Sequence, residues 1–253
     1  MFALERQKRI LELLSSDGAV MVSKLSAELG VTEETVRRDL EKLESQEFLR
    51  RTHGGALPID ESNHEYSLEK RKGINVETKQ ALAHKAVEFI ASGDTVFLDA
   101  STTTFYMAKE LKNMKNVTVI TNSLRVINEL AGTEGIKVIA VGGIVSKNQS
   151  FVGTMAENYI TDNYFADKMF FSSKGMNLNV GILESNEQEC FIKQRMIKNA
   201  STRYYLCDKS KIGRVGFVKL SSFDNIEYLI TDADIDEDSK WNLSENGVEI
   251  INA

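Results

Sequence analysis

Four hydroxyl side chains stand in a row where an apolar run ends and a helical pattern begins. The apolar run is 95–98, Asp99 follows it, and the hydroxyls belong to Ser101, Thr102, Thr103 and Thr104. Hydroxyls and free backbone N–H groups at a helix N-terminus bind phosphate well, because the helix dipole also favours negative charge there. Plain N-capping, the alternative, needs only one hydroxyl. The row therefore predicts an anion site.

Polar or glycine residues also follow other apolar runs of the same region. They are Thr121 and Asn122, Gly142 and Gly143, Lys174 and Gly175, and Asp208 and Lys211. Ligands of parallel sheets bind at the carboxyl ends of the strands, so we expect these residues to surround one ligand. Each pair also has a structural explanation, such as a helix cap, a bend, a solvated loop or an ion pair. For Asp208 and Lys211 both interpretations stay open.

Glu189 and Lys193 are four residues apart on a helix expected over 187–199. As an exposed pair they contribute only a few tenths of a kcal/mol, roughly. If the helix faces the strand ends, they instead become polar groups of the site. Periodicity leaves this open, although it places Phe191, Met196 and Ile197 together on the side expected to be buried.

A second set of residues points to nucleic acid. Thr32 is a good N-cap for a helix whose apolar stripe is Val36, Leu40 and Leu43. A shorter helix over 23–29, capped by Ser23 and stopped by Gly30, precedes it, which makes a helix-turn-helix. The second helix of such a pair enters the major groove. We expect the DNA contacts at Thr32, Thr35, Arg37 and Arg38, with Glu33 and Glu34 reading cytosine or complementing the helix dipole.

A small β-wing is expected after this helix. Residues 49–52 form a strand, Gly54-Gly55 a tight bend, and Arg50, Arg51 and His53 lie along the phosphate backbone. The alternative is a winged helix that binds protein. The two outward arginine pairs, one on the helix and one on the wing, favour DNA.

The charge of the chain does not by itself indicate nucleic acid. The net charge is −6 over 253 residues, and residues 1–57 hold nine Lys and Arg against ten Asp and Glu. A DNA-binding surface must therefore depend on where the arginines sit. The two cysteines lack metal-ligand spacing, and we expect no metal and no cofactor. No leader or membrane span is visible, which predicts a soluble, cytoplasmic protein without a membrane partner.

The chain divides into two domains of different pattern. Residues 1–57 are the winged helix-turn-helix, and 58–73, which contain the only proline, are a polar linker. Residues 74–253 alternate between helices and short apolar strands, which predicts an α/β domain with a mainly parallel sheet. Expected strands are 95–98, 117–120, 137–141, 168–171, 203–206 and 228–230. Expected helices between them are about 103–112, 123–131, 154–164, 187–199 and 236–245.

Two motifs resemble the DeoR-type bacterial regulators: Thr35-Val-Arg-Arg-Asp-Leu40 and Arg51-Thr-His-Gly-Gly-Ala56. The resemblance covers the whole chain. It implies a second domain related to ribose-5-phosphate isomerase and the coenzyme A transferases, with a phosphorylated sugar as effector. The matching positions are Asp99 with Ser101–Thr103, Thr121-Asn122, Gly142-Gly143, Lys174-Gly175, Glu189 with Lys193, and Asp208 with Lys211. The chain departs from the family where Ser101 replaces the usual glycine and Cys190 the usual alanine.

These features predict a DNA-binding repressor of a carbohydrate-metabolism operon, released from its operator by a phosphorylated sugar. We expect a homodimer or homotetramer, since two-fold symmetry lets two domains read two half-sites. One alternative is a phosphosugar isomerase with an appended DNA-binding domain, in which Glu189 and Asp99 move protons and Lys174 or Lys193 acts as electrophile. Another is a protein-interaction adaptor, which leaves the row of hydroxyls without purpose. We expect no catalytic residue.

Overall fold

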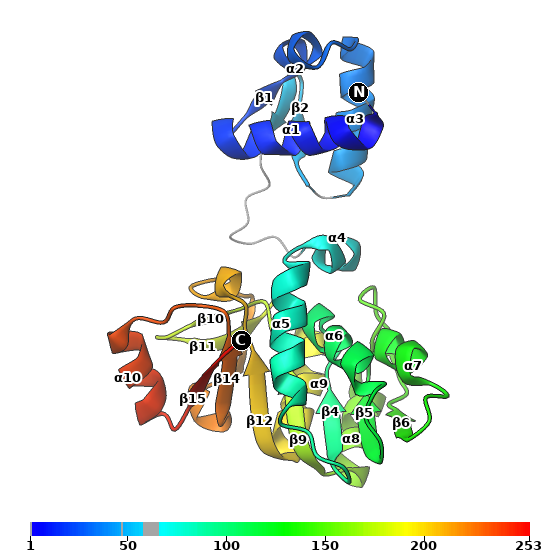
Figure 1. Ribbon diagram of the computed structural model, residues 1–253, viewed down its shortest axis with the longest axis vertical. Coiled ribbons are helices and arrows are strands. Elements are labelled where there is room, and N and C mark those ends of the chain that lie inside the picture. Colours follow the sequence, from blue (N-terminus) through cyan, green and yellow to red (C-terminus); the bar gives the residue numbers. More distant parts are fainter. Residues whose placement is uncertain (1, 47, 58–65) are drawn as a thin grey trace. The chain divides into compact units, whose positions relative to one another are not determined.

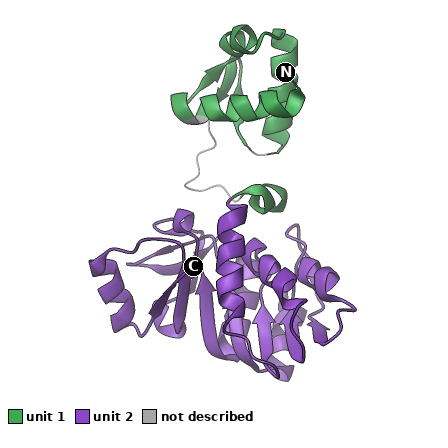
Figure 2. Cartoon of the chain, in the orientation of Figure 1, with its two compact units in different colours: residues 1–74 green, residues 75–253 purple. Residues whose placement is uncertain are grey.

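The computed structural model describes residues 2–46, 48–57 and 66–253. The chain forms two compact units, Met1–Ile74 and Asn75–Ala253 (Figures 1 and 2). Each unit has its own hydrophobic core.

The first unit is a winged helix. Its elements are α1 (Ala3–Asp17), β1 (Val20–Met21), α2 (Val22–Leu29), α3 (Glu33–Ser45), β2 (Arg50–Thr52) and β3 (Gly55–Leu57). The strands form an antiparallel sheet in the order β1-β3-β2. Gly18 and Gly30 end α1 and α2 in the left-handed conformation that glycine adopts without steric cost. The predicted helix-turn-helix and wing are therefore confirmed as a fold.

Strand β1 was not expected, and it changes two local predictions. Because β1 runs directly into α2, that helix begins at Val22 with Met21 as its N-cap, and Ser23 does not cap it. Gly55 lies in β3 instead of the bend, where an added Cβ would lie 1.8 Å from the Val20 carbonyl oxygen. Glycine is thus required there for close strand approach.

The predicted linker, 58–73, lies partly outside the described residues. Its last part forms the short helix α4 (Leu68–Gly73), whose first turn is capped by the Ser67 hydroxyl, which accepts from the backbone N–H of Lys70. Leu68 is the helix's one apolar side chain, so the sequence has no periodicity to indicate it. The boundary between the two compact units lies after Ile74, so α4 belongs to the first unit.

The second unit is built on a parallel sheet of seven strands in the order β15-β14-β12-β9-β4-β5-β6. Every neighbouring pair is parallel. The strands are β4 (Thr95–Leu98), β5 (Val117–Thr121), β6 (Ile136–Ala140), β9 (Ala166–Phe171), β12 (Ala200–Leu206), β14 (Tyr228–Thr231) and β15 (Glu249–Asn252). The chain runs outward from β4 to β6 and then returns to place β9 on the other side of β4. Strand order reverses there, which is where such sheets bind ligands.

Helices cover both faces of this sheet, and α5 is seen on its near face (Figure 1). Strand β4 shows why: Val96 and Leu98 pack into one core, and Phe97 between them packs into the other. The helices are α5 (Val76–Val87), α6 (Thr102–Leu111), α7 (Leu124–Leu130), α8 (Thr154–Asn163), α9 (Glu187–Lys198) and α10 (Glu237–Glu245). The predicted α/β class with a mainly parallel sheet is confirmed.

Short antiparallel elements complete the second unit, and none of them was predicted. They are a three-stranded sheet of β10 (Gly175–Asn177), β11 (Gly181–Glu184) and β13 (Val218–Ser221), a hairpin of β7 (Ile144–Val145) and β8 (Phe151–Val152), and the 3-10 helices η1 (Lys209–Lys211) and η2 (Phe223–Asn225). Strands of two to four residues are too short for an alternating pattern to stand out. They matter because they bring further side chains to the strand ends.

Candidate functional sites

Helix α3 presents two arginines to solvent. Val36, Leu40 and Leu43 are buried in the core of the first unit, which turns Arg37 and Arg38 outward as predicted. Each guanidinium pairs with an acid one turn earlier: Arg37 Nη2 lies 2.9 Å from Glu33 Oε2, and Arg38 Nε lies 3.3 Å from Glu34 Oε1. Exposed pairs of this kind contribute little to stability, so both arginines can exchange partners.

The start of α3 is fixed by its two threonines. The Thr32 hydroxyl accepts from the backbone N–H of Thr35 at 3.3 Å, and the two hydroxyl oxygens lie 2.9 Å apart. Thr32 is therefore the N-cap that the sequence predicted. Both hydroxyls are engaged with each other in this cap, while Glu33 and Glu34 occupy the first turn, where the dipole favours acids.

The wing exposes the three basic side chains expected of it, Arg50, Arg51 and His53. The backbone N–H of Arg51 donates to Glu44 Oε1 at 2.8 Å, which fastens β2 to the end of α3. The Arg51 guanidinium lies 3.8 Å from Glu44 Oε2. Basic side chains thus lie on both α3 and the wing.

Asp39, which no pattern in the sequence marked as a contact residue, has a structural role inside this unit. Its buried carboxylate accepts hydrogen bonds from Arg6 Nε and, at 3.0 Å, from Gln7 Nε2. These bonds join α1 to α3. Asp39 therefore orients the helix that carries Arg37 and Arg38 without facing solvent itself.

In the second unit, Asp99 lies at the end of β4 and is fully buried. Its Oδ1 accepts from the backbone N–H of Ser101 at 3.1 Å and from the Thr104 hydroxyl at 2.8 Å. Its Oδ2 accepts from the backbone N–H of Ser172 at 3.2 Å and lies 3.1 Å from Lys193 Nζ. Both oxygens of this carboxylate are therefore occupied by protein groups.

The row of hydroxyls has mixed roles. Ser101 is the N-cap of α6, and its hydroxyl accepts from the backbone N–H of Thr104 at 3.2 Å. The Thr104 hydroxyl points back to Asp99, so it is committed within the protein. The buried Thr103 hydroxyl has no hydrogen-bond partner in the described part of the chain. Capping and internal bonding thus account for two of the four hydroxyls, those of Ser101 and Thr104, while Thr102 and Thr103 stay as anion candidates.

Lys193 lies among three oxygens. Its Nζ donates to the Ser172 carbonyl oxygen at 2.8 Å and to Glu184 Oε2 at 2.5 Å, besides the ion pair with Asp99. Burial lowers the pKa of Lys193, but the carboxylates of Glu184 and Asp99 outweigh burial, so the net pKa is raised. Lys193 is therefore a buried cation. Glu184 was not predicted, because it ends the unpredicted strand β11.

Glu189 lies one turn before Lys193 on α9 and is also buried. Its Oε1 accepts from the hydroxyls of Ser146, at 3.1 Å, and Ser150. Burial raises the pKa of Glu189, and the Ser150 hydrogen bond and the charge of Lys193 oppose that rise. The two serines come from the β7–β8 hairpin, which the sequence analysis did not predict.

Helix α9 thus turns Glu189 and Lys193 inward and resolves what periodicity left open. The expectation that Phe191 shares the buried side was wrong, because its side chain is 42% exposed. Cys190 and Ile192 pack into the core instead, together with Met196 and Ile197. The helix is buried over more of its circumference than an ordinary surface helix, since it lies against both the main sheet and the small one.

The end of β5 contributes two buried polar residues. The Thr121 hydroxyl accepts from the backbone N–H of Ser123 at 3.1 Å, and Asn122 Nδ2 donates to the Phe151 carbonyl oxygen at 3.0 Å. Within the described residues, Asn122 Oδ1 is buried without a hydrogen-bond partner. Asn122 therefore ties the hairpin to β5 and keeps one acceptor unused.

The two glycine positions have packing explanations. A Cβ on Gly143 would lie 2.9 Å from the Val152 carbonyl oxygen, and one on Gly175 would lie 2.6 Å from Arg214 Cβ. Gly142 is exposed and has open space around it. Gly143 and Gly175 thus permit the hairpin and the small sheet to pack closely, and Lys174, beside Gly175, is half-buried.

Asp208 and Lys211 form an ion pair at 3.6 Å. Asp208 Oδ1 also accepts from the backbone N–H of Ser210 at 3.1 Å and from Asn75 Nδ2 at 3.3 Å. Burial raises the pKa of Asp208, but the charge of Lys211 and the Ser210 hydrogen bond outweigh it, so the net pKa is lowered. Lys211 Nζ donates to the Ser172 hydroxyl at 2.6 Å, which links this pair to the neighbours of Asp99.

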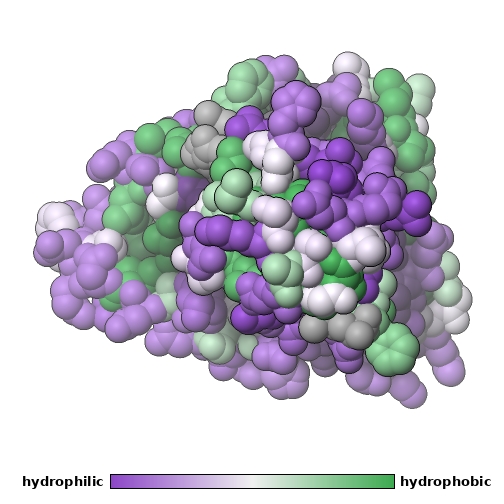
Figure 3. All heavy atoms as spheres, turned by 90° about the horizontal axis from the view of Figure 1, so that it is seen from above, coloured by the Kyte–Doolittle hydropathy of each residue, from purple (hydrophilic) through white to green (hydrophobic). Residues whose placement is uncertain are grey.

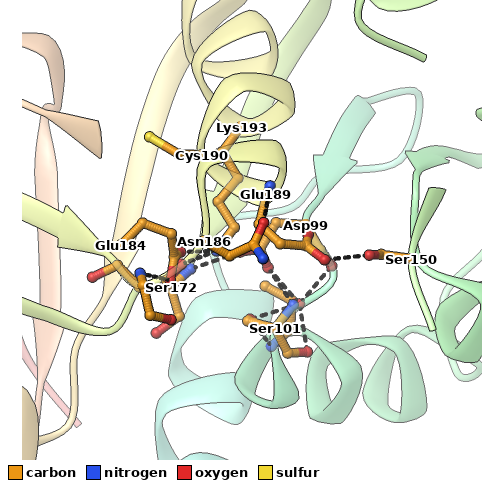
Figure 4. A network of polar contacts seen from close by, with 12 residues as sticks. Asp99, Ser101, Ser150, Ser172, Glu184, Asn186, Glu189, Cys190 and Lys193 are labelled. Atoms are coloured by element: carbon orange, nitrogen blue, oxygen red, sulfur yellow. Dashed lines mark hydrogen bonds and ion pairs between the residues drawn. The ribbon is translucent and has the colours of Figure 1, made fainter. Parts of the chain in front are cut away.

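These contacts join Asp99, Ser172, Glu184, Lys193 and Lys211, and Glu189 lies one turn from Lys193 on α9. The six residues are here called the strand-end cluster. Figure 4 shows Glu189 and Lys193 descending from α9 toward Asp99, with Ser101 below and Ser150 to one side. Among the described residues, no three His, Cys, Asp or Glu side chains are placed to hold a metal ion. In the same residues, every helix is too short or too polar to cross a lipid bilayer.

Two parts of the chain match domains of one family: residues 6–62 match the DeoR-like helix-turn-helix domain, and residues 74–233 match the DeoR C terminal sensor domain. The "Uncharacterized HTH-type transcriptional regulator YulB" of Bacillus subtilis (strain 168) is 41% identical over 251 residues, 99% of this chain and 96% of that protein. The "Putative aga operon transcriptional repressor" of Escherichia coli O157:H7 is 35% identical over 250 residues, which cover 98% of this chain and 93% of that protein. Among solved structures, ribose 5-phosphate isomerase A of Methanocaldococcus jannaschii is similar in fold alone, with a TM-score of 0.42 at 17% identity over 55% of each chain.

Proposed function

Because the chain belongs to the DeoR family of transcriptional regulators, we propose that it is a DNA-binding repressor of a carbohydrate-metabolism operon, released from its operator by a phosphorylated sugar. The observation that carries this proposal is the division of polar groups between the two units. The first unit exposes arginines on α3 and the wing. The second unit buries a charged cluster at the strand ends, where α/β sheets bind ligands.

The proposed DNA contacts are made by α3 and the wing. Arg37 and Arg38 read base edges in the major groove after they leave Glu33 and Glu34, with Thr32 and Thr35 at the leading end of the helix. Arg50, Arg51 and His53 contact phosphates. The partner is double-stranded operator DNA.

The proposed effector contacts surround the strand-end cluster. The phosphate lies at the N-terminus of α6, near Thr102 and Thr103, where the helix dipole favours it. The sugar lies toward Glu189 and the end of β5. Other positions that the sequence indicated also shape or border this site: Ser101, Thr104, Thr121, Gly142, Gly143, Lys174, Gly175, Asp208 and Lys211.

We propose that the protein has no catalytic activity. Of the two carboxylates that the isomerase alternative uses as proton-transfer groups, Asp99 is not available, because both of its oxygens are occupied by protein donors. Lys193, the electrophile of the isomerase alternative, is held by Ser172, Glu184 and Asp99. The similar proteins of Bacillus subtilis and Escherichia coli are named as a transcriptional regulator and a transcriptional repressor.

We also propose a homodimer or homotetramer joined mainly through the second unit. A single helix-turn-helix contacts too little DNA for strong specificity, and two-fold symmetry supplies a second one. Figure 3 shows hydrophobic residues in several separate groups among hydrophilic ones on the face it views. Large apolar side chains of the second unit that are exposed include Ile144, Val145 and Met155.

A mobility-shift assay on the DNA upstream of the chain's own gene tests the function. The proposal expects a retarded band that disappears when one member of a phosphosugar panel is added. The same panel is tested with the unphosphorylated sugars as controls. Binding that no phosphosugar relieves would contradict release by phosphosugar, and absence of binding to any such fragment would contradict the repressor itself.

A further inference from the structure

The charged groups of the strand-end cluster differ in how fully the protein occupies them. Asp99 has protein donors on both oxygens. Glu184 accepts from Lys193 on one oxygen and from the backbone N–H of Ser185, at 3.2 Å, on the other. Lys193 is engaged by three oxygens, and an ammonium has three N–H donors. None of these three groups keeps an obvious bonding position for a ligand.

Glu189 is the exception. Its Oε1 accepts both serine hydroxyls, and within the described residues no donor reaches its Oε2. The residue is nevertheless buried, with only 6% of its surface exposed. A buried carboxylate oxygen without a donor is costly, which is why such oxygens normally have partners.

The position of Glu189 is fixed from both sides. Ser146 and Ser150 hold its Oε1 from the β7–β8 hairpin, and Asn186 caps the helix by accepting from the backbone N–H of Glu189 at 3.1 Å. A side chain held in this way presents its second oxygen in a constant direction. That is the requirement for reading one group of a ligand rather than adapting to many.

The surrounding charges decide which chemical group suits Oε2. Asp99 and Glu184 share the single cation Lys193, so these three groups carry a net charge of one negative unit. A phosphate beside Oε2 would be repelled most directly by the Glu189 carboxylate itself, whereas a neutral hydroxyl can donate to Oε2 without that cost. Asp99 also holds the backbone N–H of Ser101 at the start of α6. The proposed phosphate position and Glu189 are therefore linked through Asp99 and Lys193.

We infer that Glu189 determines which sugar is bound, by accepting one hydroxyl of the effector on Oε2 while the phosphate lies at α6. Ser146 and Ser150 position the carboxylate for this. Asp99, Glu184 and Lys193 hold the architecture and do not contact the ligand. The inference rests on the proposed function and adds the chemical requirement that the effector carries a free hydroxyl at a fixed distance from its phosphate.

The test measures binding to the full chain by calorimetry and thermal shift. The ligands are hydroxy and deoxy pairs of pentose and hexose phosphates, with inorganic phosphate alone as a further probe. The variant is Glu189→Gln, which keeps an oxygen for the serines and replaces the second oxygen by a donor. Glu187→Gln is the matched control, since it makes the same change on the exposed side of the same helix.

In the wild type, removal of one particular hydroxyl should weaken binding by about ten- to hundredfold, as for a hydrogen bond to a charged group. Glu189→Gln should weaken binding of the hydroxy ligand by a similar factor and leave the affinities for the matching deoxy ligand and for inorganic phosphate unchanged. Glu187→Gln should bind all of these ligands as the wild type does. If Glu189→Gln binds the hydroxy ligand as tightly as the wild type does, the inference is overturned. An equal loss of affinity for phosphate, which indicates general damage to the site, would also overturn it.

The hydroxy and deoxy comparison on the wild type decides the matter even if Glu189→Gln fails to fold, because insensitivity to every single deoxygenation overturns the inference. Failure of the proposed function gives a different result. In that case no phosphosugar stabilises the wild-type protein at all.

Discussion

Lys193 Nζ lies 3.1 Å from Asp99 Oδ2, and this contact joins α9 to the end of β4 where the strand order reverses. Glu184 approaches the same ammonium from the small antiparallel sheet. One cation thus holds together the main sheet, the small sheet and the helix that carries Glu189. The contact explains how short, irregular elements are kept at the strand ends in a fixed arrangement.

Lys193→Met should destabilise the second unit strongly. The change leaves Asp99 and Glu184 buried without their shared cation, and breaking a buried pair in this way costs about 3–5 kcal/mol. Thermal and urea unfolding of the full chain measure the effect. Lys198→Met, on the exposed side of the same helix, is the control and should change stability by no more than about 0.5 kcal/mol.

A double variant sharpens this prediction. Adding Glu184→Gln to Lys193→Met removes one of the two stranded charges, so it should recover part of the loss. If Lys193→Met is as stable as wild type, the carboxylates find other partners and the structural role assigned to Lys193 is wrong.

Glu189 gives stability a specific pH dependence. Burial raises its pKa in the folded protein above the usual value of 4.5. Its contribution to stability is therefore fully present below pH 4.5 and is lost as the pH rises through the raised pKa. Measured without ligand, Glu189→Gln should gain stability relative to wild type across that rise. If the stability difference between Glu189→Gln and wild type stays constant from pH 4.5 upward, the carboxylate carries its charge in the folded protein without penalty.

The sequence predicted this region well where one strand or helix carried the signal. Asp99 and Lys193 were both named, because one follows an apolar run and the other has helical spacing. Glu184 and Ser150 were not, because no local pattern marks them. Ser150 and Glu189 are 39 residues apart in the chain, and they meet only because a hairpin of two-residue strands folds over the end of β5.

The same distinction applies to Phe191 and to the row of hydroxyls. Periodicity assumes that a helix has one buried side, whereas α9 packs against two sheets and exposes Phe191. Hydroxyl count indicated an anion site, but the directions of Ser101 and Thr104 depend on where the Asp99 carboxylate lies. Residue type can be read from a sequence, and the tertiary partner of each side chain cannot.

The α3 arginines should control operator affinity. Arg37→Ala or Arg38→Ala should weaken operator binding by about 1–3 kcal/mol, because a base contact made by arginine is worth that much. Mobility shift and fluorescence anisotropy on the operator and on unrelated DNA measure the change. Unaltered binding by a folded Arg37/Arg38 double variant would remove the proposal for α3.

The wing variants serve as the contrast. Arg50→Ala and Arg51→Ala should weaken binding to all sequences alike and reduce the salt dependence, because phosphate contacts release counterions whatever the sequence. A loss confined to the operator would instead mean that the wing reads bases.

The oligomer should be a dimer or tetramer, and the number of chains per operator should be even. Sedimentation equilibrium of the full chain, with and without operator DNA, measures both quantities. A stable interface buries about 800 Å² on each partner, and we expect exposed apolar side chains of the second unit, such as Ile144 and Met155, to lie within it. A monomer at micromolar concentration that still binds its operator tightly would contradict the prediction.

The paired change Thr102→Val with Thr103→Val separates sensing from DNA binding. It preserves volume approximately and removes two hydroxyls at the start of α6, each worth about 1.5–3 kcal/mol if it bonds a phosphate. The variant should therefore need at least about tenfold more phosphosugar for release, while its operator affinity without ligand stays nearly unchanged. Thr104→Val is the matched control: its hydroxyl bonds Asp99, so that variant should lose stability instead. The Thr103 hydroxyl has no partner within the described residues. If it also bonds no phosphate, its removal should stabilise the protein and leave release unchanged. If the paired variant melts at a higher temperature and still releases at the normal phosphosugar concentration, the hydroxyls are merely unsatisfied, and Lys174 and Lys211 become the next candidates for the phosphate.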